Sequence, residues 1–235
     1  MFPLALLNAS SPPSPPSPPV DPALTLALLH FDGVDGSTTY TDSSIYNRTV
    51  TGDGSLQQLD TSTKKFGLSS LMTTGWPTAA KRIEVLLPND ELGMSSTKKW
   101  TVEGFVKINA VTHTNAVIFQ CGTDAVFFDV SCGAFKVNNA GLSAITETAF
   151  STSLLSTTEF VHIAVVGDGV NIKLFIDGNT ILTVPYPAWN APLVSTDFHI
   201  GNSTHTQGGH YDEIRIRKEA VYTADFTPPT APFTY

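Results

Sequence analysis

Two neighbouring segments in the second half of the chain constrain the fold most. Residues 160–167 are apolar at almost every position, residues 171–177 are apolar at most positions, and the two segments are joined through Gly167-Asp168-Gly169. A strand with one face in water alternates apolar and polar side chains, so a continuously apolar strand is covered on both faces. A short glycine-rich joint between two such strands is typical of a β-hairpin. The pair therefore predicts the centre of a sheet that other layers must cover.

The remaining segments with strand character are short and are separated by turns. No stretch keeps a helical period, and turn residues recur at intervals of roughly ten residues, as in β-sandwiches. We therefore expect an all-β fold, a two-sheet antiparallel sandwich of about eleven or twelve strands. The second strand of the hairpin continues over residues 180–184. The other expected strands cover residues 24–31, 49–51, 66–73, 82–87, 100–108, 116–121, 126–132, 134–138, 198–201 and 211–217.

The charge and the apolar runs of the chain argue against nucleic-acid binding and against a membrane-spanning helix. The net charge is −8, only 14% of the residues are charged, and the basic residues form no cluster. An acidic surface repels phosphate backbones, so we expect no nucleic-acid partner. No apolar run approaches the roughly 20 residues of a membrane-spanning helix, so we expect no membrane span.

The last expected strand, 211–217, alternates and then leads into an aromatic tail. The alternation predicts that Tyr211 shares one face with the charged residues, whereas the isoleucines share the other. Tyr222 and Phe226 follow, and we expect their rings to pack against the edge of the sandwich. Pro228-Pro229 then prevents further strand pairing. The two predicted faces are Tyr211, Glu213, Arg215 and Arg217 against Asp212, Ile214 and Ile216.

The first 19 residues differ in composition from the rest. Residues 1–10 are apolar but carry no positive charge, which argues against a secretory leader and favours a peptide that docks on a partner. Residues 11–19 repeat Ser-Pro-Pro, which favours an extended polyproline spacer of roughly 25–30 Å over a ligand for a proline-binding domain. We therefore expect an extended arm, 1–19, before a domain at 20–235. Its docking side chains are Phe2, Leu4, Leu6 and Leu7.

The two cysteines are expected to be free thiols. Cys121 and Cys132 lie on successive expected strands joined by a short turn, which places them roughly 20 Å apart. A disulfide needs Cα atoms within about 7 Å. Free thiols are typical of a protein made in a reducing cytoplasm.

Seven motifs in a fixed order resemble those of a known family, the concanavalin A-like or laminin G-type jelly roll. The version that they resemble is the one frequent in phage virion proteins, and the resemblance covers about residues 21–235. It implies a jelly-roll sandwich and leaves the function to be argued from the site. The motifs are LLHFDG (28–33), DSS (42–44), KFGLSSL (65–71), WTVEGFVK (100–107), FVHIAV (160–165) with LFIDG (174–178), YDEIRI (211–216) and YTADFTPP (222–229).

The same family includes glucanases, but the sequence does not favour catalysis. Glycoside hydrolysis needs two carboxylates about 5–10 Å apart, and the Glu-x-Asp-x-x-Glu run of such glucanases is missing. The pairs Asp90-Glu91 and Asp212-Glu213 are adjacent in sequence, so on a strand their side chains point to opposite faces. The histidines are scattered, and those in apolar strands, His162 and His199, are expected to be satisfied core residues. We expect a protein that is not an enzyme and requires no cofactor.

Calcium is the ion that the resemblance allows. Jelly rolls of this type often carry a structural Ca²⁺ near the first and last strands. Asp212 matches the aspartate of the family's closing Asp-Glu-x-Arg motif, and Asp32 follows the first expected strand. The alternative is that Asp212 bonds to turn backbone and that Asp32 caps its own loop. The chain lacks the dense Asp/Asn run of a calcium loop, which favours this alternative.

Two tryptophans are candidates for carbohydrate binding. Trp76 and Trp189 lie in loop-like contexts beside proline, where an exposed ring can stack on a sugar. Burial at the edge of the sandwich, or contact with a neighbouring subunit, is the alternative for both.

Taken together, these features predict a non-enzymatic phage virion structural protein. In this hypothesis it is a capsid decoration or cement protein on the virion surface, made in the host cytoplasm. The arm 1–19 anchors it to other virion proteins, and it assembles as a homo-oligomer. The first alternative is a tail or fibre adhesin that binds host glycan through Trp76 or Trp189. The second is a carbohydrate-active enzyme.

Overall fold

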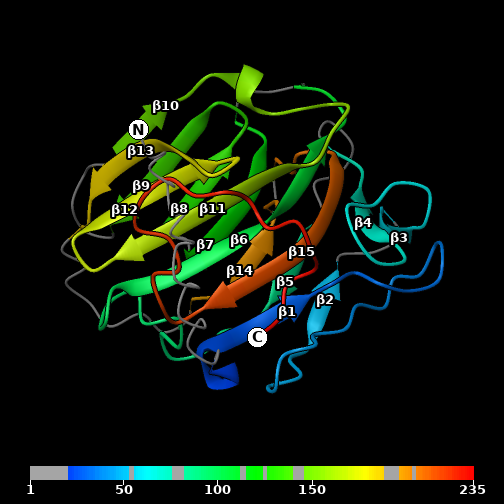
Figure 1. Cartoon of the computed structure of the whole chain (residues 1–235), viewed down its shortest axis with the longest axis horizontal. Coiled ribbons are helices and arrows are strands. Elements are labelled where there is room, and N and C mark those ends of the chain that lie inside the picture. The colour runs from blue at the N-terminus through cyan, green and yellow to red at the C-terminus, as the bar shows by residue number, and fades with distance from the viewer. Residues whose placement is uncertain are drawn as a thin grey trace, which may run out of the picture.

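The protein is a sandwich of two antiparallel β-sheets. The computed structural model describes residues 21–52, 56–75, 82–111, 115–123, 126–139, 146–187, 196–202 and 205–235. Within these residues the helical elements are two short 3-10 turns, Pro22–Leu24 and Thr152–Leu154. No helix in this part of the chain is long and apolar enough to cross a membrane. The sheets stack face to face (Figure 1), which confirms the predicted all-β sandwich.

Sheet A has eight strands and contains the hairpin from which the prediction began. Its order is β13-β12-β11-β6-β15-β4-β3, and β1 pairs with β15 beyond the end of β4. The first and the last described strands, β1 and β15, therefore lie side by side in the same sheet. The strands are β1 (Thr25–Leu29), β3 (Gln57–Asp60), β4 (Ser70–Thr73), β6 (Lys99–Ile108), β11 (Val161–Asp168), β12 (Asn171–Ile176), β13 (Asn179–Pro185) and β15 (Gly209–Arg217).

Sheet B has seven strands in the order β10-β9-β8-β7-β14-β5-β2. Strand β14 enters between β7 and β5, so segments far apart in the sequence become neighbours. The strands are β2 (Val50–Gly52), β5 (Ile83–Val85), β7 (Val117–Thr123), β8 (Val126–Ser131), β9 (Ala134–Asn139), β10 (Thr146–Ala149) and β14 (Phe198–Ile200).

The core lies between the two sheets and is dense in aromatic rings. Trp100 of β6 stacks on Phe128 of β8 with 5.0 Å between ring centroids, which joins sheet A to sheet B. The indole N–H of Trp100 donates to the Tyr186 hydroxyl at 2.6 Å, so the buried indole keeps a hydrogen-bond partner. Cys121 and Cys132 are buried and free, as predicted.

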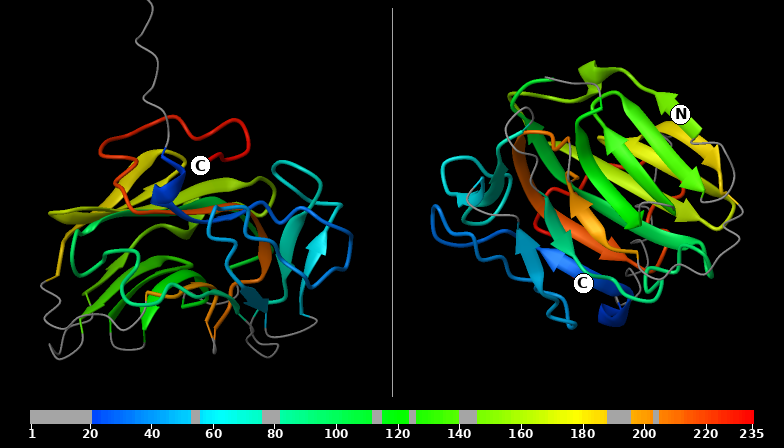
Figure 2. Two further views of the ribbon diagram at one scale, coloured as in Figure 1. Left: turned by 90° about the horizontal axis from the view of Figure 1, so that it is seen from below. Right: turned by 180° about the vertical axis from the view of Figure 1, so that it is seen from behind.

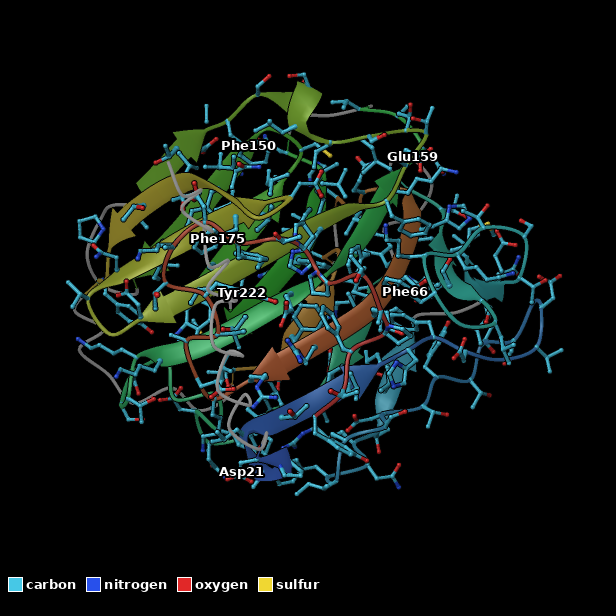
Figure 3. All side chains as sticks on the ribbon, in the orientation of Figure 1. Asp21, Phe66, Phe150, Glu159, Phe175 and Tyr222 are labelled. Carbon is cyan, nitrogen blue, oxygen red and sulfur yellow. The ribbon has the colours of Figure 1, made fainter. Side chains whose placement is uncertain are left out.

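The outer face of sheet A is covered by residues 218–235, which we call the C-terminal strap. Figure 2 shows this segment crossing sheet A on the side away from sheet B. The Tyr222 and Phe226 rings stack on each other with 3.6 Å between their centroids, and both pack over Phe175 of β12. Figure 3 shows Tyr222 beside Phe175. The prediction that these rings pack against the sandwich edge is therefore wrong. They cover the sheet face, which explains why β11 and β12 are apolar on both sides.

Strand β15 does not alternate as its sequence suggests. Glu213 adopts a left-handed backbone with φ of 51°, and the pairing with β6 shifts there, which marks a bulge. The shift moves Tyr211 into the inter-sheet core with the two isoleucines. Glu213 remains on the outer side, where it contacts His30 at 2.8 Å and accepts a hydrogen bond from the backbone N–H of Phe233 at 2.8 Å. The predicted grouping of Tyr211 with the charged residues is therefore wrong.

Two further details differ from the expected strands. Strands β3 and β10 are present although the sequence did not predict them, because both are edge strands with polar composition. The first residues of the expected strand 66–73 form a loop instead, and β4 begins at Ser70. The arm 1–19 lies outside the described residues, and so do its docking side chains Phe2, Leu4, Leu6 and Leu7.

Candidate functional site

A row of polar side chains crosses the outer face of sheet B, and we call it the polar row. Its members pair in register across all seven strands, each opposite a member of the next strand. Cross-strand partners have Cβ atoms about 4.5–5.5 Å apart, so the row is continuous. From β2 to β10 its members are Thr51, Glu84, His199, Gln120, Asp129, Lys136 and Glu147.

The local sequence explains why these side chains point outward. Five strands repeat an apolar-polar-apolar triplet, and the apolar residues on both sides of the polar one are buried in the inter-sheet core. Successive strand residues point to opposite faces, so burying the flanking pair turns the central residue away from the core. The triplets are Ile83-Glu84-Val85, Phe119-Gln120-Cys121, Phe128-Asp129-Val130, Phe135-Lys136-Val137 and Phe198-His199-Ile200.

One end of the polar row is a charged cluster. The Glu84 carboxylate forms an ion pair with the Arg82 guanidinium, with 2.7 Å between Oε2 and Nη2, and it contacts Nε2 of His199 at 3.2 Å. Burial, and then the nearby Arg82 charge, hold the pKa of His199 below its usual value, which favours the neutral ring. Nε2 then donates to the Glu84 carboxylate. Nδ1 of His199 is buried and lacks a hydrogen-bond partner.

The centre of the polar row contains hydrogen-bonding groups that have no partner among the described residues. Asp129 is only 6% exposed, and its Oδ1 accepts a hydrogen bond from the Ser131 hydroxyl at 2.8 Å. Burial raises the pKa of Asp129 to about 6. Its other oxygen and the side-chain amide of its cross-strand neighbour Gln120 have no hydrogen-bond partner among the described residues. A carboxylate beside an amide presents acceptors and donors together, as a ligand with hydroxyl groups requires.

The outer faces of the two sheets differ in how they are covered. The C-terminal strap lies over sheet A, whereas no described helix or strand lies over sheet B (Figure 2). Gln120 and Lys136 are half-buried and Glu147 is exposed, so a ligand can reach the middle and the β10 end of the polar row.

Asp32 and Asp212, the predicted calcium ligands, both bind the loop of residues 65–69. Asp212 Oδ2 accepts hydrogen bonds from the first two backbone N–H groups of this loop at 2.7 and 3.1 Å. Asp32 Oδ1 accepts from the N–H groups of Leu68 and, at 3.3 Å, Ser69. The two aspartates therefore hold opposite ends of one loop, which is the turn-bonding alternative considered for Asp212.

The described residues do not assemble a calcium cage around these aspartates. Oδ1 of Asp212 is buried without a hydrogen-bond partner, and one open oxygen is far fewer than the six to eight that Ca²⁺ takes. In the part of the chain that the structure describes, no group of three or more His, Cys, Asp or Glu side chains is placed to hold a metal ion. Calcium binding stays a prediction, and nothing in the proposed function depends on it.

The two candidate tryptophans, Trp76 and Trp189, lie outside the described residues. Both histidines that were expected in the core are buried, and each contacts a glutamate. His199 lies outside the inter-sheet core, however, because it faces outward in the polar row. His162 is fully buried, but under the C-terminal strap, where its Nε2 lies 3.1 Å from Glu103.

Comparison with known proteins identifies the family to which this architecture belongs. The family model described as the concanavalin A-like lectin/glucanases superfamily, of laminin G type, matches residues 81–225, more than half of the chain. The chain belongs to this family. The match includes six of the seven strands that carry the polar row, from β5 to β14. The comparison with curated proteins finds no match.

Solved structures with the same fold include botulinum neurotoxin binding domains. The serotype C1 binding domain matches with a TM-score of 0.64 at 13% identity, over 86% of this chain and 50% of that chain. A structure titled for the dependence of type C neurotoxin cell entry on two ganglioside molecules matches with a TM-score of 0.63 at 14% identity, over 86% and 49%. This chain of the laminin G-type family therefore spans about half the length of these structures. At such low identity the likeness concerns the fold alone.

The polar row was not among the predicted site residues. Its members come from distant parts of the chain, and only the strand order brings His199 of β14 between Glu84 and Gln120. The repeated apolar-polar-apolar triplet is the signal that was available in the sequence. It identifies outward side chains but does not show that they lie in one row.

Proposed function

We propose that this protein is a non-catalytic glycan-binding module and that the polar row is its binding face. The observation that carries the proposal is the unbroken row of hydrogen-bonding side chains across seven strands of sheet B. It lies on the sheet face that the strap leaves uncovered.

The geometry suits a carbohydrate. Strands lie about 4.8 Å apart, so the seven members span roughly 29 Å, a length suited to an extended chain of several sugars. Sugar hydroxyls both donate and accept hydrogen bonds, and Gln120 beside Asp129 offers both functions to one ligand. Trp76 and Trp189 remain candidates for stacking on the same ligand. The ganglioside named for the neurotoxin structure is an acidic glycolipid, so by analogy of fold it supports a carbohydrate ligand but not the charge of that ligand.

Binding to an array of immobilised oligosaccharides tests this proposal. We expect the full chain to bind a subset of glycans, and Gln120→Ala to weaken that binding roughly fivefold, as the loss of about one hydrogen bond predicts. Gln58→Ala is the matched control, because Gln58 is also half-buried on a strand but lies in sheet A. Equal binding by the Gln120 variant would contradict the assignment of the site.

Catalysis is the competing interpretation of this face. Asp129 and Glu147 lie two strands apart, roughly 10 Å between backbones, and carboxyl groups of inverting glycosidases are about 6.5–9.5 Å apart. The raised pKa of Asp129 would suit a general acid. Release of reducing sugar from any bound polysaccharide, abolished in Asp129→Asn, would overturn the non-catalytic part of the proposal.

The composition of the arm 1–19 favours a second function, attachment to a virion. Four apolar side chains followed by a polyproline spacer suit a peptide that docks on another subunit at a distance from its own domain. In this proposal the jelly roll is displayed on the virion surface by phage structural subunits, as a homo-oligomer. It is then a capsid decoration protein or, with glycan binding, a tail or fibre adhesin.

A further inference from the structure

We infer that the polar row selects neutral, hydroxyl-rich glycans and discriminates against acidic ones. This inference rests on the proposed function and specifies the class of ligand. It is argued from the charges of the row, their partners and the side chains that remain open.

The polar row carries more carboxylates than cations. The row and the adjoining Arg82 hold three carboxylates, Glu84, Asp129 and Glu147, against two cations, Arg82 and Lys136. Recognition of a carboxylate or sulfate group in a protein site usually requires an uncompensated Arg or Lys.

Each cation has carboxylate neighbours. Arg82 forms its ion pair with Glu84 at 2.7 Å. Lys136 lies in register between Asp129 on one side and Glu147 on the other, and its Nζ donates to the Asn115 side-chain oxygen at 3.5 Å. An acidic sugar bound at the centre of the row would therefore meet Asp129 as well as Lys136, with more carboxylates than cations around it. The negative charge of the sugar would repel the neighbouring Asp129 carboxylate, and removing both charges from water would weaken binding further.

The open groups of the row suit hydroxyls instead. The Gln120 amide both donates and accepts, and the second Asp129 oxygen accepts. On the other side of Gln120, His199 is only 6% exposed, its Nδ1 is buried, and its Nε2 contacts Glu84, so it adds no open group. Hydroxyl groups both donate and accept, so they match the Gln120 amide and the open Asp129 oxygen.

The test uses pairs of immobilised oligosaccharides that share one neutral backbone and differ by a single sialic acid or sulfate. We expect the full chain to bind the neutral member roughly tenfold more tightly than its acidic partner, as an unfavourable charge contact predicts. Binding without discrimination, or preference for the acidic members, would overturn this inference and leave glycan binding intact. Failure to bind any member would overturn the proposed function and the inference with it.

Two variants that change the charge of the row in opposite directions distinguish an electrostatic effect on binding from damage to the fold. Asp129→Asn removes a carboxylate, so we expect the discrimination to narrow roughly fivefold, whereas Lys136→Gln removes a cation and should widen it by a similar factor. A structural defect would weaken neutral and acidic binding together. Discrimination that moved in the same direction in both variants would therefore contradict the inference.

Discussion

At the scale of single residues, the most constrained group is Glu103 on β6. Its side chain is fully buried, and its Oε1 accepts hydrogen bonds from Nε and Nη2 of Arg215 at 2.9 and 2.7 Å. Oε2 accepts from the Tyr222 hydroxyl at 2.8 Å and contacts His162 at 3.1 Å. Burial alone would raise the pKa of Glu103, but His162 and Arg215 together hold it below its usual value. A buried charge so fully bonded is costly to disturb.

Neutralising Glu103 should therefore destabilise the protein. We expect Glu103→Gln to reduce the free energy of unfolding by about 3 kcal/mol, because Arg215 loses its charged partner inside the protein. Glu219→Gln is the control, since its ion pair with Arg217 is partly exposed and should contribute less than about 1 kcal/mol. Urea unfolding of the two variants measures the difference. Similar losses would show that Glu103 contributes no more than a surface pair.

Asp212 should make stability depend on pH. Burial raises its pKa from 3.8 to about 7 in the folded protein. As pH rises from 4 to 7 the unfolded chain therefore releases this proton first, and the free energy of unfolding falls. Asp212→Asn removes this contribution, so the variant should gain stability relative to the wild type by roughly 2–4 kcal/mol over that range. Urea unfolding at pH 4, 5.5 and 7.5 measures the gain, and a constant difference would contradict the assignment.

At the scale of elements, the C-terminal strap depends on one glycine at the β12–β13 turn. A Cβ on Gly178 would lie 1.9 Å from the Phe226 carbonyl oxygen, whereas one on Gly36 meets nothing within 4 Å. Both glycines have the same left-handed backbone, with φ of 75° and 74°, so alanine strains both turns alike.

Gly178→Ala should therefore destabilise the protein more than Gly36→Ala. We expect the difference to be about 2 kcal/mol, because only Gly178→Ala forces the strap away from sheet A. Hydrogen exchange should rise at Phe226, whose N–H donates to the Gly178 carbonyl at 2.9 Å. Equal exchange in the two variants would mean that the strap tolerates the contact.

Elements also show where prediction from the sequence succeeded and where it failed. The apolar runs of β11 and β12 identified the covered centre of sheet A, because burial on both faces leaves a direct trace in composition. The bulge at Glu213 left no such trace, since its contacts to His30 and Phe233 are long-range. The polar row was missed for a related reason. Alternation shows which side chains face outward, but the register between distant strands places them together.

At the scale of the whole molecule, the described residues outside the sheets cover one outer face of the sandwich, and no described helix or strand covers the other. The strap buries the outer face of sheet A, and the polar row lies on the outer face of sheet B (Figure 2). Attachment and ligand binding can therefore use different parts of the chain, with the arm 1–19 serving attachment in the virion proposal.

Removing the arm should separate these roles. We expect a chain that begins at residue 20 to keep its unfolding midpoint within about 2 °C and its glycan binding, because the described core and the polar row are built from strands that begin at Thr25. Association with virion particles should be lost, as measured by co-sedimentation. Full occupancy of particles by the truncated chain would contradict attachment through the arm.

The central claim is that a glycan binds across sheet B on the polar row. The most direct test is to titrate a neutral oligosaccharide identified on the array into the isotope-labelled full chain and to map amide chemical-shift changes. The account predicts that the largest changes fall on β14, β7, β8 and β9, around His199, Gln120, Asp129 and Lys136. Changes confined to sheet A or to the loop 65–69, with sheet B unaffected, would contradict it.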